Sequence, residues 1–130
     1  MDKKKRILVV DDDDQIANMY TTYLNLKGFV TQRVNNGEDA LAVTLVFKPD
    51  LIILDVMMPK ISGIQVLDIL RNTDKTKHIP VIMLTALGGK EDREKAEAFG
   101  PIDYFVKTEV DLDTIIKKIE ETHIALVKDL

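Results

Sequence analysis

Residues 51–59, LIILDVMMP, decide the fold. The first four are large and apolar without alternation, which is typical of a strand buried on both faces in the middle of a parallel sheet. Asp55 stands where this apolar run ends, and Pro59 stops regular structure soon afterwards. Open α/β sheets bind their ligands at the carboxyl ends of the strands, which makes Asp55 a candidate site residue. An isolated aspartate there belongs more often to an ordinary turn, so the rest of the chain has to decide.

Strand and helix patterns alternate along the chain. Apolar runs predict strands at 7–10, 29–34, 51–54, 80–84 and 102–106, and the polar character of the second places it near a sheet edge. Between them, apolar residues recur at helical spacing. The residues that define these helices are Ile16, Met19, Tyr20, Tyr23 and Leu24; Ala40, Leu41, Thr44 and Leu45; Val66, Leu67 and Leu70; a thin stripe in the charged segment 90–99; and Leu112, Ile115, Ile116 and Ile119.

Local signals mark the element boundaries. Lys27-Gly28 ends the first helix, the turn 35–37 opens the second, and Ser62 with Gln65 forms a capping box for the third. Gly100-Pro101 breaks the charged helix, and the closing helix begins at about Asp111. Strand then helix, five times over, demands a parallel sheet with right-handed crossovers and helices on both faces. The predicted fold is α/β, a single doubly wound (βα)5 domain.

Composition excludes several classes of protein. The 130 residues suit one domain, with 45% hydrophobic and 31% charged residues, as in an ordinary soluble globular protein. Apolar runs fall far short of the roughly 20 residues that a membrane span needs, and the basic N-terminus lacks the apolar core of a signal peptide. The net charge of −4 argues against direct nucleic-acid binding, and the absence of cysteine favours a cytoplasmic location.

Polar residues stand at the ends of four predicted strands. Asp11 and Asp12 follow the first strand, Asp55 ends the third, Thr85 ends the fourth and Lys107 ends the fifth. The carboxyl ends of parallel strands share one edge, so these groups are expected to form one polar pocket. Clustered carboxylates raise each other's pKa unless a cation lies among them, and oxygen ligands mixed with water suit Mg²⁺. A carboxylate can itself attack phosphorus, and phosphoryl transfer asks mainly for alignment and neutralised charge.

These motifs resemble the receiver domain of two-component response regulators along nearly the whole chain. The residues that carry the resemblance are 7–12 (ILVVDD), 54–59 (LDVMMP) with Ser62-Gly63, 83–86 (MLTA) and 103–107 (DYFVK). The resemblance implies a flavodoxin-like sheet of order 2-1-3-4-5. It also implies a phosphoprotein of phosphorelay signalling. The implied phosphoryl donor is a sensor histidine kinase or phosphotransfer protein, and the implied recipient of the signal is a downstream protein target or fused output domain. A membrane is not among the implied partners.

The resemblance assigns a role to each site residue. Asp55 would accept the phosphoryl group. Asp12 and Asp55 would bind Mg²⁺ through their side chains, Met57 through its backbone carbonyl and Asp11 through water. Lys107 would pair with Asp55 and then with the phosphate. Thr85 would donate its hydroxyl to the phosphoryl group, and Tyr104 would swing inward behind Thr85. Ala86 is small enough to leave room for the phosphate. The only reactions expected are transfer to Asp55 and its self-dephosphorylation.

A physical argument supports a switch at the same place. A phosphoryl group adds about −1.5 to −2 charge at one point, and a threonine hydroxyl attracted to it can move the loop 84–89, which Gly88-Gly89 makes permissive. The charged helix 90–99 has few apolar anchors and is a candidate reader surface. One departure from the family is Thr108 in place of the usual proline, which predicts either a strained bond or a rearranged loop, with Thr108 and Asp111 as candidate helix caps. The other is Gly100-Pro101, which should stiffen the start of the last strand.

Three rival interpretations remain. A haloacid-dehalogenase-type phosphatase also begins with a strand and Asp-x-Asp, but Gln15 stands where that family has Thr or Val, and 130 residues leave little room for its cap. A flavin-binding protein would need a phosphate loop, which the acidic residues 11–14 do not provide. The third is a receiver-like scaffold that binds proteins without phosphorylation. Residues 1–130 are expected to form one receiver domain, with a core of about 5–127 and no output domain.

Overall fold

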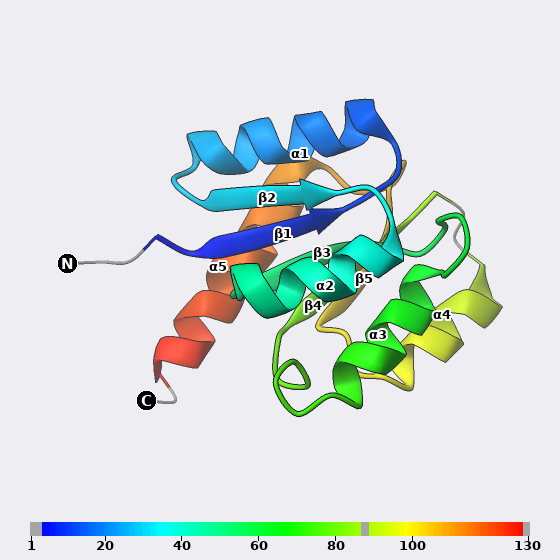
Figure 1. Cartoon of the computed structure of the whole chain (residues 1–130). Coiled ribbons are helices and arrows are strands. Elements are labelled where there is room, and N and C mark those ends of the chain that lie inside the picture. Colours follow the sequence, from blue (N-terminus) through cyan, green and yellow to red (C-terminus); the bar gives the residue numbers. More distant parts are fainter. Residues whose placement is uncertain (1–3, 87–88, 129–130) are drawn as a thin grey trace.

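A computed structural model describes residues 4–86 and 89–128, with side chains up to residue 122, and within these ranges strands and helices alternate strictly (Figure 1). The predicted loop residues Leu87 and Gly88 and the side chain of His123 lie outside this description. The elements are β1 Arg6–Val10, α1 Asp14–Leu26, β2 Val30–Val34, α2 Gly37–Phe47, β3 Leu51–Asp55, α3 Gly63–Arg71, β4 Val81–Thr85, α4 Lys90–Glu97, β5 Asp103–Val106 and α5 Leu112–Lys128.

The sheet has the predicted topology. Its strands run parallel in the order β2-β1-β3-β4-β5, so the polar strand β2 lies at an edge and β3 lies in the middle. Every residue of β3 is buried, as the uninterrupted apolar run predicts. The parallel register brings the carboxyl ends of β1, β3, β4 and β5 to one edge, because Val10 pairs with Leu54, Asp55 with Leu84 and Thr85 with Val106.

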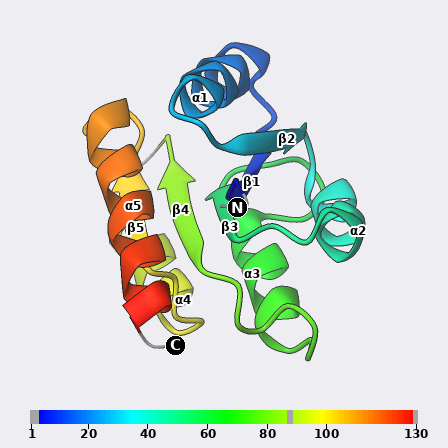
Figure 2. The same ribbon diagram turned by 90° about the vertical axis from the view of Figure 1, so that its left-hand side faces the viewer.

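Two layers of helices cover the sheet. Helices α2, α3 and α4 pack on one face, and α1 and α5 pack on the other (Figure 2). Alternating residues of the strands divide between the two cores: Leu8 and Ile52 point to the first face, whereas Ile7 and Ile53 point to the second. The doubly wound (βα)5 architecture is therefore confirmed.

Side-chain caps fix several helix starts where the sequence predicts them. Ser62 and Gln65 form the predicted capping box of α3, with Ser62 N donating to Gln65 Oε1 at 2.8 Å and Gln65 N donating to Ser62 Oγ at 3.2 Å. Asn36 caps α2, and Asp111 Oδ1 accepts the N–H of Thr114 at 2.8 Å at the start of α5. Each cap satisfies a backbone donor that the helix itself leaves unpaired.

The segment after β5 forms a turn. Glu109 N donates to Val106 O at 2.9 Å, and no peptide bond in the described ranges is cis. A cis bond before Thr108, the strained alternative, is therefore absent, and a hydrogen-bonded turn leads from β5 toward α5. Two residues are more exposed than the sequence predicts. Met19 and Leu45, which were assigned to apolar helix faces, are 48% and 49% exposed.

Candidate functional site

Asp11 and Asp12 lie directly beyond the carboxyl end of β1. The side chain of Asp11 is buried, with 2% exposed, and its Oδ1 accepts the N–H of Asp13 at 2.9 Å. Asp12 is exposed. Asp13 then caps α1 by accepting the N–H of Ile16 at 3.0 Å. The loop therefore holds one carboxylate inside the edge of the sheet and leaves its neighbour in solvent.

Asp55 ends β3 and is 3% exposed, and its Oδ1 accepts the N–H of Met57 at 3.3 Å. The loop that follows is shaped by Gly63, whose N–H donates to Val56 O at 2.8 Å. A Cβ on Gly63 would lie 2.0 Å from the carbonyl oxygen of Asp55, so only glycine allows α3 to begin this close to the strand. This close approach fixes the backbone on both sides of the carboxylate.

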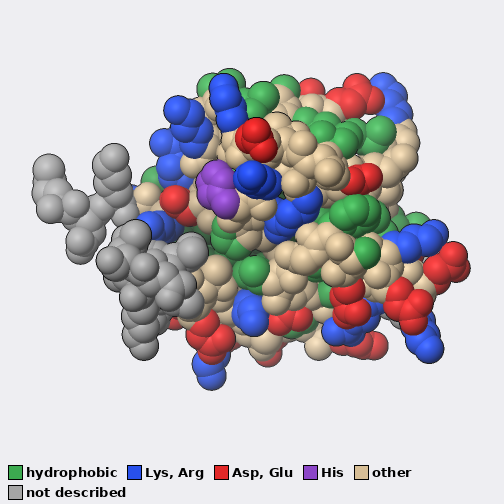
Figure 3. All heavy atoms as spheres, turned by 90° about the horizontal axis from the view of Figure 1, so that it is seen from below, with side chains coloured by type: hydrophobic (Ala, Val, Ile, Leu, Met, Phe, Trp, Pro, Cys, Tyr) green, Lys and Arg blue, Asp and Glu red, His purple; other side chains and the backbone are tan. Residues whose placement is uncertain are grey.

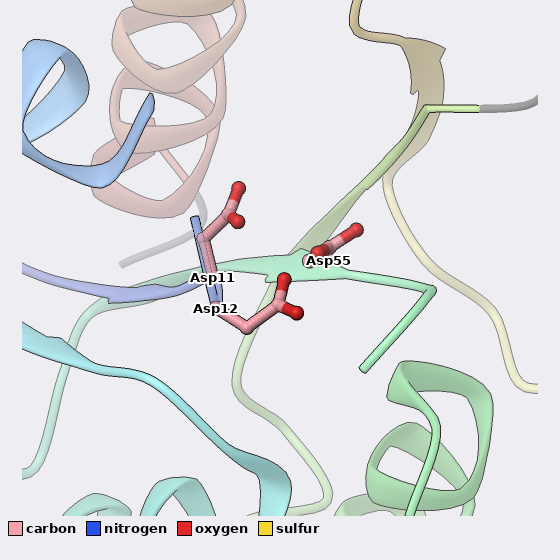
Figure 4. Close-up of side chains that lie close together, drawn as sticks. All are labelled: Asp11, Asp12 and Asp55. Carbon is pink, nitrogen blue, oxygen red and sulfur yellow. The ribbon is translucent and has the colours of Figure 1, made fainter. Parts of the chain in front are cut away.

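One ammonium group joins the two buried carboxylates. Lys107, the residue after β5, places its Nζ 2.7 Å from Asp11 Oδ2 and 3.4 Å from Asp55 Oδ2. The predicted pairing of Lys107 with Asp55 is present, but the contact with Asp11 is the shorter one. Figure 4 shows the side chains of Asp11, Asp12 and Asp55 gathered at the ends of β1 and β3.

Burial makes this cluster electrostatically costly. The pKa of Asp55 is raised to about 7, chiefly by burial and secondly by the negative charge of Asp11, while Lys107 and the N–H of Met57 offset part of the effect. The pKa of Lys107 is raised as well: burial acts to lower it, but the hydrogen bond to Asp11 and the charges of Asp55 and Asp11 together outweigh burial. The edge therefore holds more negative charge than its own lysine neutralises.

The three carboxylates fit a divalent cation. Asp11, Asp12 and Asp55 each offer an oxygen, and these oxygens lie within 4.8 Å of one another. Three carboxylates and one ammonium leave an excess of negative charge, and an all-oxygen set open to water suits Mg²⁺. The N–H of Met57 donates to Asp55 Oδ1, so the backbone of Met57 lies beside the carboxylate cluster.

Thr85 and Tyr104 are neighbours beside this cluster. Thr85 ends β4 and is fully buried, and its carbonyl accepts the N–H of Lys107 at 2.8 Å. Tyr104 is 5% exposed, and its buried hydroxyl has no hydrogen-bond partner within 3.5 Å among the described residues. Burial raises the pKa of Tyr104, although Thr85 lies close enough for its hydroxyl to lower that pKa in part. Tyr104 therefore already points inward in this structure.

Arg33 is a supporting residue that the sequence did not reveal. From β2 its Nη1 lies 2.8 Å from Asp14 Oδ1, and its Nη2 donates to the carbonyl oxygen of Asp11 at 2.8 Å. These contacts brace the acidic loop after β1 from the neighbouring strand. The only sequence signal would have been the strand register, which sets Arg33 beside Val9. His78, in contrast, is exposed and lines a hollow with residues from the amino ends of β3 and β4, away from the acidic edge.

A hollow of about 610 Å³ adjoins the acidic edge. It lies between the loop after β3 and α4, and Asp12 connects it to the carboxylate cluster. Its lining is mainly apolar on the loop side and charged on the α4 side: Val56, Met57, Met58, Pro59, Ile64, Asp92 and Lys95 are among the residues. The hollow therefore reaches the acidic edge at Asp12, whereas Asp11 and Asp55 stay buried behind it.

Comparison with known proteins decides the family. Residues 7–120 match the family model described as the response regulator receiver domain. The chain belongs to this family. The predicted two-component receiver is therefore confirmed, and the carboxylate cluster occupies the acidic pocket in which receiver domains bind Mg²⁺.

The receiver has relatives of different lengths. It is 39% identical over 102 residues to the DNA-binding dual master transcriptional regulator RpaA of Synechocystis sp., covering 78% of this chain and 42% of RpaA. It is 33% identical over 103 residues to the polar-differentiation response regulator DivK of Brucella anthropi, covering 79% of this chain and 84% of DivK. Chemotaxis protein CheY4 of Vibrio cholerae has a similar structure, with a TM-score of 0.84, 28% identity and coverage of 92% and 98% of the two chains.

The relatives bear on one further expectation from the sequence, and the structure bears on another. The chain spans less than half the length of RpaA, whose name describes a DNA-binding protein, and this contrasts with the expected absence of direct nucleic-acid binding. Among the described residues, the receiver has no helix that is both long and apolar enough to cross a bilayer.

Proposed function

We propose that this receiver accepts a phosphoryl group on Asp55 and changes its surface in response. The observation that carries the proposal is the convergence of Asp55, Asp11 and Lys107 at the carboxyl edge of the sheet, next to an open hollow. Asp55 is the inner carboxylate that is followed directly by residues lining this hollow, Val56 and Met57. Its donor would be the phosphoimidazole of a histidine kinase or phosphotransfer protein.

In the reaction, a carboxylate oxygen of Asp55 attacks phosphorus and the phosphorus–nitrogen bond of the donor breaks. The attack needs ionised Asp55, and a pKa of about 7 leaves a substantial ionised fraction at neutral pH. Lys107 then contacts a phosphoryl oxygen as a point charge. The side chains of Asp12 and Asp55, the carbonyl of Met57 and, through water, Asp11 would hold Mg²⁺, and a bound Mg²⁺ would neutralise further phosphoryl charge.

The response would begin at Thr85 and Tyr104. The new phosphoryl oxygens attract the hydroxyl of Thr85, and Tyr104 is held in the inward position that this structure already contains. Ala86, which follows Thr85, is exposed and small enough to leave room. The altered loop leads into α4, whose side chains are anchored in the core by Ala96 alone among its eight residues. We propose that α4 is the surface that a downstream protein or an output domain reads.

The proposed function limits the chemistry of the receiver to its own side chain. It transfers a phosphoryl group to Asp55 and loses it again by hydrolysis, without turning over other substrates. A scaffold that binds partners without phosphorylation is the main alternative, and a phosphatase acting on external substrates is the other. A cytoplasmic location stays a prediction.

Intact-mass spectrometry after incubation with acetyl phosphate tests the proposal. The expected result is one added phosphoryl group that requires Mg²⁺, is absent in Asp55→Asn and persists in the control Asp74→Asn, whose side chain is 97% exposed. If neither a phosphoryl adduct nor binding of beryllofluoride is observed, the result would support a scaffold that binds partners without phosphorylation. Steady release of phosphate from several phosphate esters would instead support the phosphatase.

A further inference from the structure

Helix α2 is apolar almost all round. After its first three residues, the sequence ALAVTLVF contains one polar residue, Thr44, and that residue is buried. Helices on a protein surface normally have a polar outer face. Here the outer face instead exposes Leu45 at 49% and Val46 at 82%. The packing of α2 on the sheet does not account for these two residues.

A hollow of about 620 Å³ opens beside this face. It lies at the amino ends of β3 and β4, between the end of α2 and the segment between α3 and β4. Leu45 belongs both to the exposed face of α2 and to the lining of the hollow, so the two features form one surface. We call it the amino-edge groove; it consists of Val46 and the lining residues Thr44, Leu45, Lys48, Pro49, Asp50, Thr73, Lys75, Thr76, His78 and Ile79.

The groove is locally basic. Lys48, Lys75 and His78 line it and are exposed, whereas Asp50 is the one acidic residue among the described residues of the lining. Asp50 Oδ2 accepts the N–H of Arg6 at 2.9 Å, so part of its hydrogen-bonding capacity is already used. Figure 3 shows several Lys and Arg side chains near a histidine on this face of the molecule, with fewer acidic side chains among them. In a chain of net charge −4, such a cluster favours an acidic ligand.

The hydroxyl groups of the groove are not free donors. Thr44 donates to Ala40 O at 2.6 Å, Thr73 to Ile69 O at 2.7 Å and Thr76 to Leu70 O at 2.7 Å. Recognition in the groove therefore rests on apolar contact, on the charges of Lys48 and Lys75, and on the exposed imidazole of His78 as a hydrogen-bonding group. A small phosphate ion would use only the charges and would leave the apolar side of the groove without a function.

We propose that the amino-edge groove binds a segment of a partner protein that carries apolar side chains flanked by acidic residues. An apolar side chain of the partner enters the hollow and covers Leu45 and Val46, and its carboxylates face Lys48, Lys75 and His78. The concave shape favours a protruding side chain over a lipid surface, since membrane-bound proteins insert protruding apolar groups of their own. The groove lies at the opposite edge of the sheet from Asp55, so this binding is separate from phosphorylation.

A pair of synthetic peptides tests the proposal. One is a helical 15-residue peptide with leucine at every third or fourth position and glutamate elsewhere, and the other has lysine in place of each glutamate. Each is titrated into the full ¹⁵N-labelled chain and followed by amide chemical shifts. The acidic peptide is expected to shift amides of residues 44–50 and 72–79, and the basic peptide is not.

Matched variants show whether residues of the amino-edge groove contribute to binding of the acidic peptide. Val46→Glu and Lys75→Glu should each weaken binding of the acidic peptide by about fivefold or more, since each adds a negative charge against the ligand. Leu26→Glu, at a residue 79% exposed at the end of α1, and Lys117→Glu on α5 should leave the affinity unchanged. All four changes are at exposed side chains, so the fold is retained, and acetyl phosphate should still modify Asp55 in each.

Three results would overturn the proposal. The first is an absence of shifts in residues 44–50 and 72–79, or equal shifts with both peptides. The second is binding to vesicles of phosphatidylglycerol that Val46→Glu abolishes, which would make the groove a membrane contact. The third is a dimer in sedimentation velocity that Val46→Glu dissociates, which would assign the face to a second copy of the chain.

Discussion

Helices α2 and α4 lie on the same face of the sheet, on either side of α3, and are built in opposite ways (Figure 1). Helix α2 buries Ala40, Thr44 and Phe47 and still has apolar side chains exposed. Helix α4 has the sequence KEDREKAE and buries Ala96 alone. Its charged residues form three ion pairs at spacing i, i+4: Lys90–Glu94 at 3.9 Å, Glu91–Lys95 at 3.4 Å and Arg93–Glu97 at 3.1 Å.

This difference separates two kinds of surface. Exposed ion pairs at this spacing contribute about 0.3–0.5 kcal/mol each, far less than a buried aromatic side chain. Helix α4 is therefore held weakly and borders the acidic edge through Asp92 and Lys95, which suits a segment that moves with charge at Asp55. Helix α2 is held by packing, which suits a rigid docking surface.

The largest expected effect tests how firmly each helix is anchored. Phe47→Ala in α2 should lower the free energy of unfolding by about 3 kcal/mol, because it empties a packed site and removes the contact between the ring and the guanidinium of Arg6, 4.5 Å away. Ala96→Gly in α4 should cost about 1–2 kcal/mol, from helix propensity and one lost methyl group. Urea denaturation measures both. Equal losses would contradict the difference in anchoring.

The second prediction concerns the acidic edge that α4 borders and α2 does not. The pKa of Asp55 is about 7 in the folded chain and 3.8 in the unfolded chain, so the folded state binds the proton more tightly. Its contribution to stability is neutral below about pH 4, becomes unfavourable as the pH rises to about 7 and is constant above that. Asp55→Asn should therefore raise the free energy of unfolding at pH 8, without Mg²⁺, by about 1–3 kcal/mol.

Urea denaturation at pH 4, 6 and 8 checks this second prediction. The gain from Asp55→Asn should shrink as the pH falls, and Mg²⁺ should reduce it by stabilising the parent chain. Asp74→Asn serves as the control, since that side chain is 97% exposed and should change stability by less than about 0.5 kcal/mol. A gain that is independent of pH would show that the charge of Asp55 is not its cause.

Native-state hydrogen exchange compares the two helices directly. The amides of α4 should open with a free energy about 1.4 kcal/mol or more below that of the α2 amides, which corresponds to about tenfold faster exchange in α4. Adding beryllofluoride with Mg²⁺ should change exchange in α4 and leave α2 as it was. Similar protection of both helices, or a response confined to α2, would remove α4 as the proposed reader surface.

The smallest expected effect concerns the ion pairs of α4. Glu94→Gln and Glu97→Gln should each lower the free energy of unfolding by no more than about 0.5 kcal/mol, because both partners in each pair are more than half exposed. Thermal denaturation at low and high salt measures the loss, which should vanish at high salt. A loss as large as that of Ala96→Gly would mean that one exposed ion pair stabilises α4 as much as its buried side chain does.

Much of the fold and of the site follows from local patterns. The apolar run 51–54 indicates a strand buried on both faces, and Ser62 with Gln65 indicates a capped helix start; both are observed. The order of strands and helices indicates a parallel sheet, and in such a sheet residues that end different strands meet at one edge. For this reason Asp11, Asp55, Thr85 and Lys107 could be assigned to one pocket from the sequence.

Helical phase was harder to predict from sequence. In α2 nearly every residue is apolar, so the pattern does not distinguish the side that faces the sheet from the side that faces solvent, and Leu45 was assigned to the wrong side. In α1 the buried residues are Ala17, Tyr20 and Leu24, whereas Met19 lies off this stripe and is half exposed. Packing against the sheet selects the buried stripe, and a local count of apolar residues does not.

The sequence alone therefore determined the fold class, the strand ends and the identity of the chemical groups at the acidic edge, because periodicity and strand order are local properties. The tertiary structure decided how those groups interact. It set Lys107 closer to Asp11 than to Asp55, raised the pKa of Asp55 by burial, turned Tyr104 inward and placed Leu45 beside Lys75 and His78 in one groove. Distances and desolvation depend on how distant segments pack together, and the order of residues along the chain does not contain them.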